Sequence, residues 1–213
     1  MPVAARRAVF FPLLVLVALG VAACGSSGKS TTSAAATATG ATTATNAATP
    51  TTAGSRVLVG KQTSVALNPA TSELLREHQI VVTAVAPATY RKTLLWPVSG
   101  GQIAVATVAG TIAHTGGVKL SHAGKSVQVT SFIVNTSTKQ VTALVGGQRL
   151  PIFALDLSSV KHQTAVGGTI VESGLKLTLT EQAATALNSA LGVSAFKTGQ
   201  LFGTATLTLA VKP

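Results

Sequence analysis

Short apolar runs, separated by glycine-rich turns at fairly regular spacing, most constrain the fold of this chain. Most runs alternate or are rich in β-branched residues, as in QIAVATVAGTI (102–112) and KSVQVTSFIVN (125–135). Turn signals such as SGG (99–101), TGG (115–117) and VGGQ (145–148) divide them. Many short strands with turns of this kind favour an antiparallel β-sandwich or a barrel-like domain.

Two segments depart from the strand pattern and predict short helices. In the first, Asn68 can cap the helix and Pro69 suits its first position. In the second, Thr180 can cap, Leu187 belongs to an apolar stripe, and Gly192 can end the helix. The predicted fold class is therefore mainly β, with two short α-helices. Because only 4% of the residues are aromatic, we expect a core built mainly from Val, Leu, Ile and Ala.

The first residues of the chain have the layout of an export signal. Two arginines precede an apolar segment over 8–17, and small residues then lead to Cys24, the only cysteine. The apolar segment is short for a membrane-spanning helix. Residues 21–24, VAAC, resemble the lipobox of bacterial lipoproteins. That resemblance implies removal of residues 1–23 and a lipid on Cys24 that anchors the protein to the outer face of the cell membrane. The alternative is an ordinary secretory signal.

Residues 24–55 form a tether between this anchor and the folded part of the chain. The stretch is nearly all Ser, Thr, Ala and Gly and carries one charged side chain, Lys29. Such a composition buries too little apolar surface to offset the entropy of ordering, which predicts disorder. Residues 56–213 are then expected to form a single β-rich domain.

The formal net charge of +11 reflects a scarcity of acids, because the chain has 16 Lys and Arg but only five Asp and Glu. The basic residues are scattered singly along the chain. A nucleic-acid-binding protein usually clusters them on one element, so we expect no nucleic-acid partner. Attraction to an anionic lipid surface or wall polymer is the simpler consequence of this charge.

The histidines do not indicate a metal site. No HxH or HExxH motif occurs. His114 lies at the end of a predicted strand against a glycine turn, and His122 lies in the next turn. The two could meet across the end of a hairpin, but solvent-facing turn histidines are the simpler expectation, and no metal is predicted.

The chain also carries no convincing catalytic constellation. Asp156, Ser158, Ser159 and His162 crowd one stretch, whereas a catalytic triad draws its members from separate parts of a fold. No G-x-S-x-G turn is present to hold a nucleophile. We therefore predict that the protein is not an enzyme.

Two aromatic residues and a cation lie close together in the stretch PATYRKTLLWPVSGG. Tyr90 and Trp96, with Arg91 beside them, could form a binding lip for an anionic ring or a sugar. They could equally anchor a loop on the domain. Phe132, by contrast, lies in an apolar run and is expected in the core.

Three segments in the second half of the chain are distinctive: GTIAHTGGVKL (110–120), VTALVGG with LPIFALDL (141–157), and LTEQAATALNSALGVSAFKTG (179–199). With these segments, the second half resembles the HtaA domain of actinobacterial haem-uptake surface proteins. The resemblance implies haem as the ligand and sets His114 in the place of the family's histidine. The tyrosine of the family's Ser-Phe-x-x-Tyr motif has no match here, since Tyr90 stands in APATYRK.

Two interpretations of function follow. The first is an exported, lipid-anchored, non-catalytic ligand-binding module, with haem as the candidate cofactor and His114, Tyr90, Trp96 and Arg91 as candidate contacts. The second is a structural envelope lipoprotein that contacts wall polymer or protein partners and has no small-molecule ligand.

Overall fold

The protein is described by a computed structural model, which covers residues 54–165 and 168–212. The predicted signal peptide, Cys24 and almost all of the predicted tether lie outside the described residues. No helix in the described part of the chain is both long enough and apolar enough to cross a membrane.

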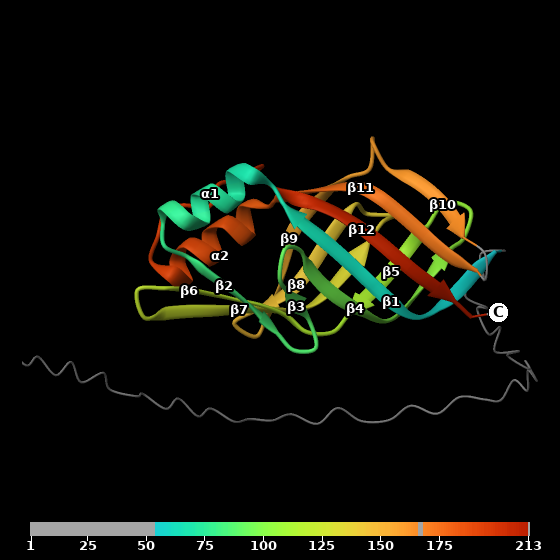
Figure 1. Ribbon diagram of the computed structural model, residues 1–213, viewed down its shortest axis with the longest axis horizontal. Coiled ribbons are helices and arrows are strands. Elements are labelled where there is room, and N and C mark those ends of the chain that lie inside the picture. Colours follow the sequence, from blue (N-terminus) through green and yellow to red (C-terminus); the bar gives the residue numbers. More distant parts are fainter. Residues whose placement is uncertain (1–53, 166–167, 213) are drawn as a thin grey trace, which may run out of the picture. The chain divides into compact units, whose positions relative to one another are not determined.

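Twelve strands and two helices make up this part (Figure 1). In chain order they are β1 (Ser55–Leu67), α1 (Pro69–Glu77), β2 (Val81–Val85), β3 (Thr89–Tyr90), β4 (Leu94–Ala104), β5 (Ala109–His114), β6 (Gly117–His122), β7 (Lys125–Asn135), β8 (Gln140–Val145), β9 (Gln148–Asp156), β10 (Lys161–Ala165), β11 (Thr169–Leu179), α2 (Glu181–Leu191) and β12 (Leu201–Val211).

Eight of the strands close into an antiparallel barrel in the order β7-β5-β4-β1-β12-β11-β9-β8, and the β7–β8 pairing completes the circle. The prediction of a mainly β, antiparallel fold with two short helices is confirmed, and of the two predicted architectures the barrel is the one formed. The remaining strands extend it: β6 and β2 continue outward from β7, β10 pairs with β11, and β3 pairs with β4.

A bulge in β7 lets one strand serve both the barrel and its extension. The first part of β7 pairs with β6, and its last residues, Ile133 to Asn135, pair with β5. Between them the register against β8 shifts, and Ser131 has a φ of 54°. A bulge of this kind bends a strand and redirects its side chains.

The two helices lie at the same end of the barrel because of the strand directions (Figure 1). β1 and β11 flank β12, both antiparallel to it, so they run in the same direction, and each continues into a helix. The predicted caps are present. The Asn68 side chain accepts from the Ala70 N–H at 2.9 Å, the Thr180 hydroxyl accepts from the Ala183 N–H at 3.1 Å, and Gly192 is left-handed.

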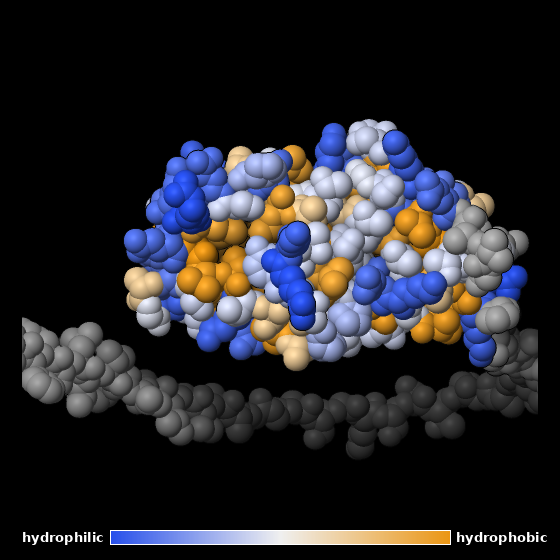
Figure 2. Space-filling view, viewed as in Figure 1, coloured by the Kyte–Doolittle hydropathy of each residue, from blue (hydrophilic) through white to orange (hydrophobic). Residues whose placement is uncertain are grey.

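The core fills the inside of the barrel and the space beneath the helices, and Val, Leu, Ile and Ala dominate it, as predicted. Alternation along the strands selects its members. In β4, for example, Leu94, Trp96 and Val98 are buried, while their neighbours are partly exposed. On the face shown in Figure 2, polar and apolar residues are interspersed.

Candidate ligand-binding interior

His114 lies inside the barrel, with only 3% of its surface exposed. The prediction of a solvent-facing turn histidine is wrong. Ile112, two residues earlier in β5, is fully buried, and the two-residue period of a strand carries His114 to the same inward face. The glycine turn begins only after this inward position.

Both ring nitrogens of His114 have hydrogen-bond partners. Nδ1 lies 3.3 Å from the backbone oxygen of Phe132, and Nε2 lies 2.7 Å from the hydroxyl of Thr63. A carbonyl oxygen can only accept, so Nδ1 carries the proton and Nε2 accepts from the Thr63 hydroxyl. Burial lowers the pKa of His114 to about 4, although backbone hydrogen bonds oppose the shift. The ring is therefore neutral at pH 7.

Trp96 joins this cluster from β4. Its ring stacks on Phe132 with centroids 4.2 Å apart and planes at 18°, and it meets His114 edge-on at 6.5 Å. The indole Nε1 is buried and has no hydrogen-bond partner within the described residues. Three strands, β4, β5 and β7, thus bring an aromatic pair and a neutral histidine together in the interior.

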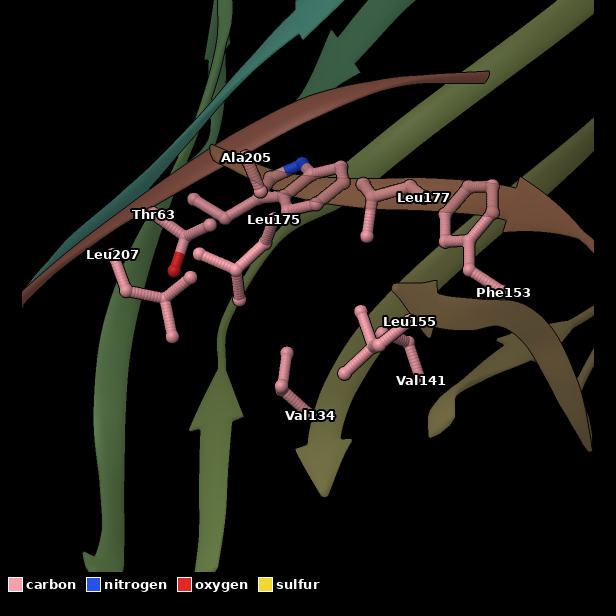
Figure 3. A pocket seen from close by; sticks show the side chains of 10 residues that line it. Thr63, Val134, Val141, Phe153, Leu155, Leu175, Leu177, Ala205 and Leu207 are labelled. Carbon is pink, nitrogen blue, oxygen red and sulfur yellow. The ribbon is translucent and has the colours of Figure 1, made fainter. Parts of the chain in front are cut away.

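Two small cavities border Trp96. The central cavity has a volume of about 10 Å³, and the Thr63 hydroxyl lies among its apolar lining (Figure 3). The other has a volume of about 20 Å³ and lies beneath α2, where Leu187 contributes to its wall with Leu94, Phe132 and Phe153. Each holds at most about one water molecule, so the core around Trp96 is close-packed apart from these two spaces.

The described residues do not fit a haem coordinated through its iron. An axial ligand must direct a free donor atom toward a space that accommodates the macrocycle. His114 has both nitrogens engaged, and the cavities beside Trp96 are far smaller than a porphyrin. Tyr90 lines neither cavity. We therefore assign haem iron no ligand in this structure.

The other candidate contacts are only partly brought together. Tyr90 is half-buried on β3 and pairs with Leu94, which borders the cavity beneath α2. Arg91 is exposed, whereas Trp96 is 3% exposed and faces the interior. The structure does not gather Tyr90, Trp96 and Arg91 into one surface lip, and it brings Trp96 to His114 instead.

Sequence reasoning missed Thr63, the hydrogen-bond partner of His114. A signal was available, because Thr63 alternates with the buried Val65 in β1 and so shares its inward face. Its pairing with the histidine depends on β4 lying between β1 and β5, which no local pattern specifies.

The stretch from Asp156 to His162 forms no catalytic triad. The Asp156 carboxylate accepts from the backbone N–H of Ser158 at 2.9 Å and lies 3.6 Å from the Lys176 ammonium. His162 pairs with Glu172 on β11. Within residues 54–165 and 168–212, no group of three His, Cys, Asp or Glu side chains is arranged to hold a metal ion.

Sequence comparison finds no family model that matches the chain and no similar curated protein. Comparison with solved structures does find similar proteins. The C-terminal domain of HtaA from Corynebacterium glutamicum superposes with a TM-score of 0.57 at 10% identity, over 74% of this chain and 99% of that domain. The chain has the HtaA fold.

Two further crystal structures resemble it more distantly. A domain-swapped dimer of a variant of that HtaA domain gives a TM-score of 0.49 at 12% identity, over 68% of this chain and 91% of that one. The haem-binding protein HtaB of the same organism gives a TM-score of 0.44 at 14% identity. The match covers 74% of this chain and 96% of that protein. Both of these TM-scores fall below 0.5, so only the C-terminal domain of HtaA defines the fold of this chain. Fold alone does not define a ligand, which must be argued from the site.

Proposed function

We propose that this protein is an exported, lipid-anchored, non-catalytic binding module with the HtaA fold, which takes up an apolar ligand beneath α2. Haem is the candidate ligand, on the basis of the sequence resemblance. Since the described residues offer its iron no ligand, the proposal is that the ring is held through apolar and aromatic contacts. Trp96 and His114 are the candidate contacts inside, and Tyr90 and Arg91 are those on the neighbouring β3 side.

One observation carries the proposal: the stacked pair of Trp96 and Phe132 borders an apolar cavity that α2 also lines. α2 covers this cavity with Leu187 and packs on β7 and β9. A flat apolar ligand can stack on such an aromatic pair once the helix moves outward. Lids that move in this way are drawn from the less stable parts of a fold.

Trp96 is the only tryptophan of the chain, so its fluorescence reports directly on this cavity. The full-length chain in detergent is titrated with haemin and, separately, with iron-free protoporphyrin. We expect both to quench Trp96 saturably at one equivalent. Leu187→Phe fills the cavity and should weaken binding about tenfold, on the scale of one buried side chain.

Ser189→Phe is the matched control, because it adds the same ring on the exposed side of α2. Its affinity should equal that of the unmodified chain. Unsaturable quenching, or equal affinity in both variants, would exclude uptake beneath α2. Binding of haemin but not of protoporphyrin, with a Soret band lost in His114→Ala or Tyr90→Phe, would mean that the iron is ligated after all.

A separate observation favours the second candidate function, contact with an anionic wall polymer. An open groove of about 340 Å³ runs beside β6 and the start of β7, and we call it the basic groove. Its lining includes Lys119, His122 and Lys125, with Val81 at its edge. Among the described residues, no acidic side chain lines it, so it suits a chain of phosphate groups.

Inorganic polyphosphate tests this candidate. Each lysine near an anionic surface contributes about 1 kcal/mol, so the double variant Lys119→Gln/Lys125→Gln should bind about thirtyfold more weakly at low salt. The control pair Lys161→Gln/Lys197→Gln removes the same charge elsewhere on the exposed surface. Equal losses in the two pairs would mean that only net charge matters, and the basic groove would not be a binding site.

A further inference from the structure

A larger cavity lies at the end of the barrel away from the helices. Its volume is about 190 Å³, and apolar side chains of β11, β12 and the loop after β9 form most of its wall, Leu157, Val160, Leu175 and Leu207 among them. Leu175 and Leu207 also border the small central cavity, so this pair separates the two spaces. Apolar cavities of about 150 Å³ hold a benzene-sized molecule.

One carboxylate lines this cavity. Glu172 is 5% exposed and is the only buried acidic residue in the described part of the chain. It lies two residues after the buried Ile170 in β11, so alternation turns it toward the barrel interior. A carboxylate in apolar surroundings is costly unless a positive or hydrogen-bonding group compensates it.

His162 supplies part of that compensation. It lies directly opposite Glu172 on β10, and its Nδ1 contacts the carboxylate. The histidine side chain is 41% exposed, against 7% for the glutamate. It therefore approaches from the solvent side and does not line the cavity. The carboxylate is compensated from outside, while its inner surroundings remain apolar.

The other polar groups of the lining are used by the fold. The Thr136 hydroxyl donates to the Val108 carbonyl and accepts from the Gly110 N–H, and the Thr107 hydroxyl accepts from the Ala109 N–H. These bonds hold the turn between β4 and β5. Glu172 is thus the one charged group among the lining residues, facing a space large enough for a small organic molecule.

We infer that this cavity binds a small organic cation, an alkylammonium with an apolar group of about six carbons, whose nitrogen pairs with Glu172. The apolar group fills the space between Leu157, Val160 and Leu207. The net charge of +11 does not prevent this, because exposed charges are screened beyond about 10 Å at 0.1 M salt. The site is separate from the proposed one beneath α2 and does not depend on it.

The four glutamates of the chain allow a direct test. The full-length chain in detergent, carrying a ¹³C label at the glutamate side-chain carboxyls, gives four signals, and Glu172→Gln identifies one of them. Cyclohexylammonium chloride is the probe, and cyclohexanol is its neutral counterpart. We expect the amine to move the Glu172 signal saturably while the other three stay in place.

Variants of Glu172 and its neighbours test whether amine binding depends on the charge of the carboxylate. Glu172→Gln should weaken amine binding about tenfold or more, the scale of a hydrogen bond to a charged group. The exposed control Glu181→Gln should bind as the unmodified chain does. His162→Gln should tighten binding, since it leaves the carboxylate less compensated. Equal binding of cyclohexanol and the amine, or a common drift of all four signals, would overturn the proposal.

A second variant keeps the test decisive if Glu172→Gln unfolds. Val160→Phe fills the cavity and leaves the carboxylate in place, so it should abolish the saturable shift of the Glu172 signal. Thermal melts of each variant establish that the barrel is intact. An unchanged shift in a folded Val160→Phe chain would show that the amine binds outside the cavity.

Discussion

Phe132→Ala should lower the free energy of unfolding by about 4 kcal/mol, within the range of 3–5 for truncating a buried phenylalanine. The side chain is 1% exposed, stacks on Trp96 at 4.2 Å, and borders the cavity beneath α2. Its removal enlarges that cavity and loses the aromatic contact. Urea denaturation, followed by Trp96 fluorescence and far-ultraviolet circular dichroism, measures the change.

Phe202→Ala is the matched control for this substitution. Phe202 also borders the cavity and packs on Phe153 at 4.9 Å, but it is only partly buried. Its truncation should therefore cost less than that of Phe132. If the two variants lose the same free energy of unfolding, α2 collapses onto whichever space is opened. The Trp96–Phe132 contact would then stabilise the core no more than the Phe153–Phe202 contact does.

The stability of the barrel should fall by about 3 kcal/mol between pH 7 and pH 4 through His114 alone. The folded pKa of about 4 lies below the ordinary value of 6.5 because burial disfavours the imidazolium. Between these values the unfolded chain binds more protons than the folded chain. The contribution of His114 is therefore fully present above pH 6.5 and is lost as the pH falls toward 4.

His114→Gln isolates this effect, since it removes the titrating group and keeps a polar side chain beside Thr63. The two chains are identical at every other position, so the difference between their two pH profiles belongs to His114. We expect the variant to lose about 3 kcal/mol less than the unmodified chain over the same interval. Parallel profiles would mean that folding leaves the pKa of His114 at its ordinary value.

The helices were predictable because their signals are local. Asn68 and Pro69 mark one start, while Thr180 and Gly192 bracket the other helix, and each acts through backbone groups within four residues. The strands were predictable for a similar reason, since alternation and glycine turns are visible along the chain.

Closure of the barrel was not predictable from such signals. It depends on β7 and β8 pairing while β7 also reaches β5 and β6, which the bulge at Ser131 permits. A sandwich and a barrel use the same alternating strands, and the difference lies in which edges meet. That information is spread over residues far apart in the sequence.

The positions of Trp96, Arg91 and His114 could not be predicted from their neighbours in the sequence. Trp96 and Arg91 are near neighbours in sequence, yet the inward face of β4 takes the tryptophan into the core and Arg91 stays in solvent. His114 is close to a glycine turn, yet its strand position sets its burial. Side-chain direction in a strand outweighs proximity along the chain.

The direction of β1 has a mechanical consequence. This strand begins at the barrel end where β12 finishes, as the bond from the Lys212 N–H to the Val57 carbonyl shows, and it runs to the helical end. Its ladder bonds lie across the strand. A pull between Ser55 and the helical end of the barrel loads those bonds together, in shear. A pull between Ser55 and Val211 peels β1 from β12 one pair at a time. The same barrel therefore withstands tension toward its helical end better than tension between its two chain ends.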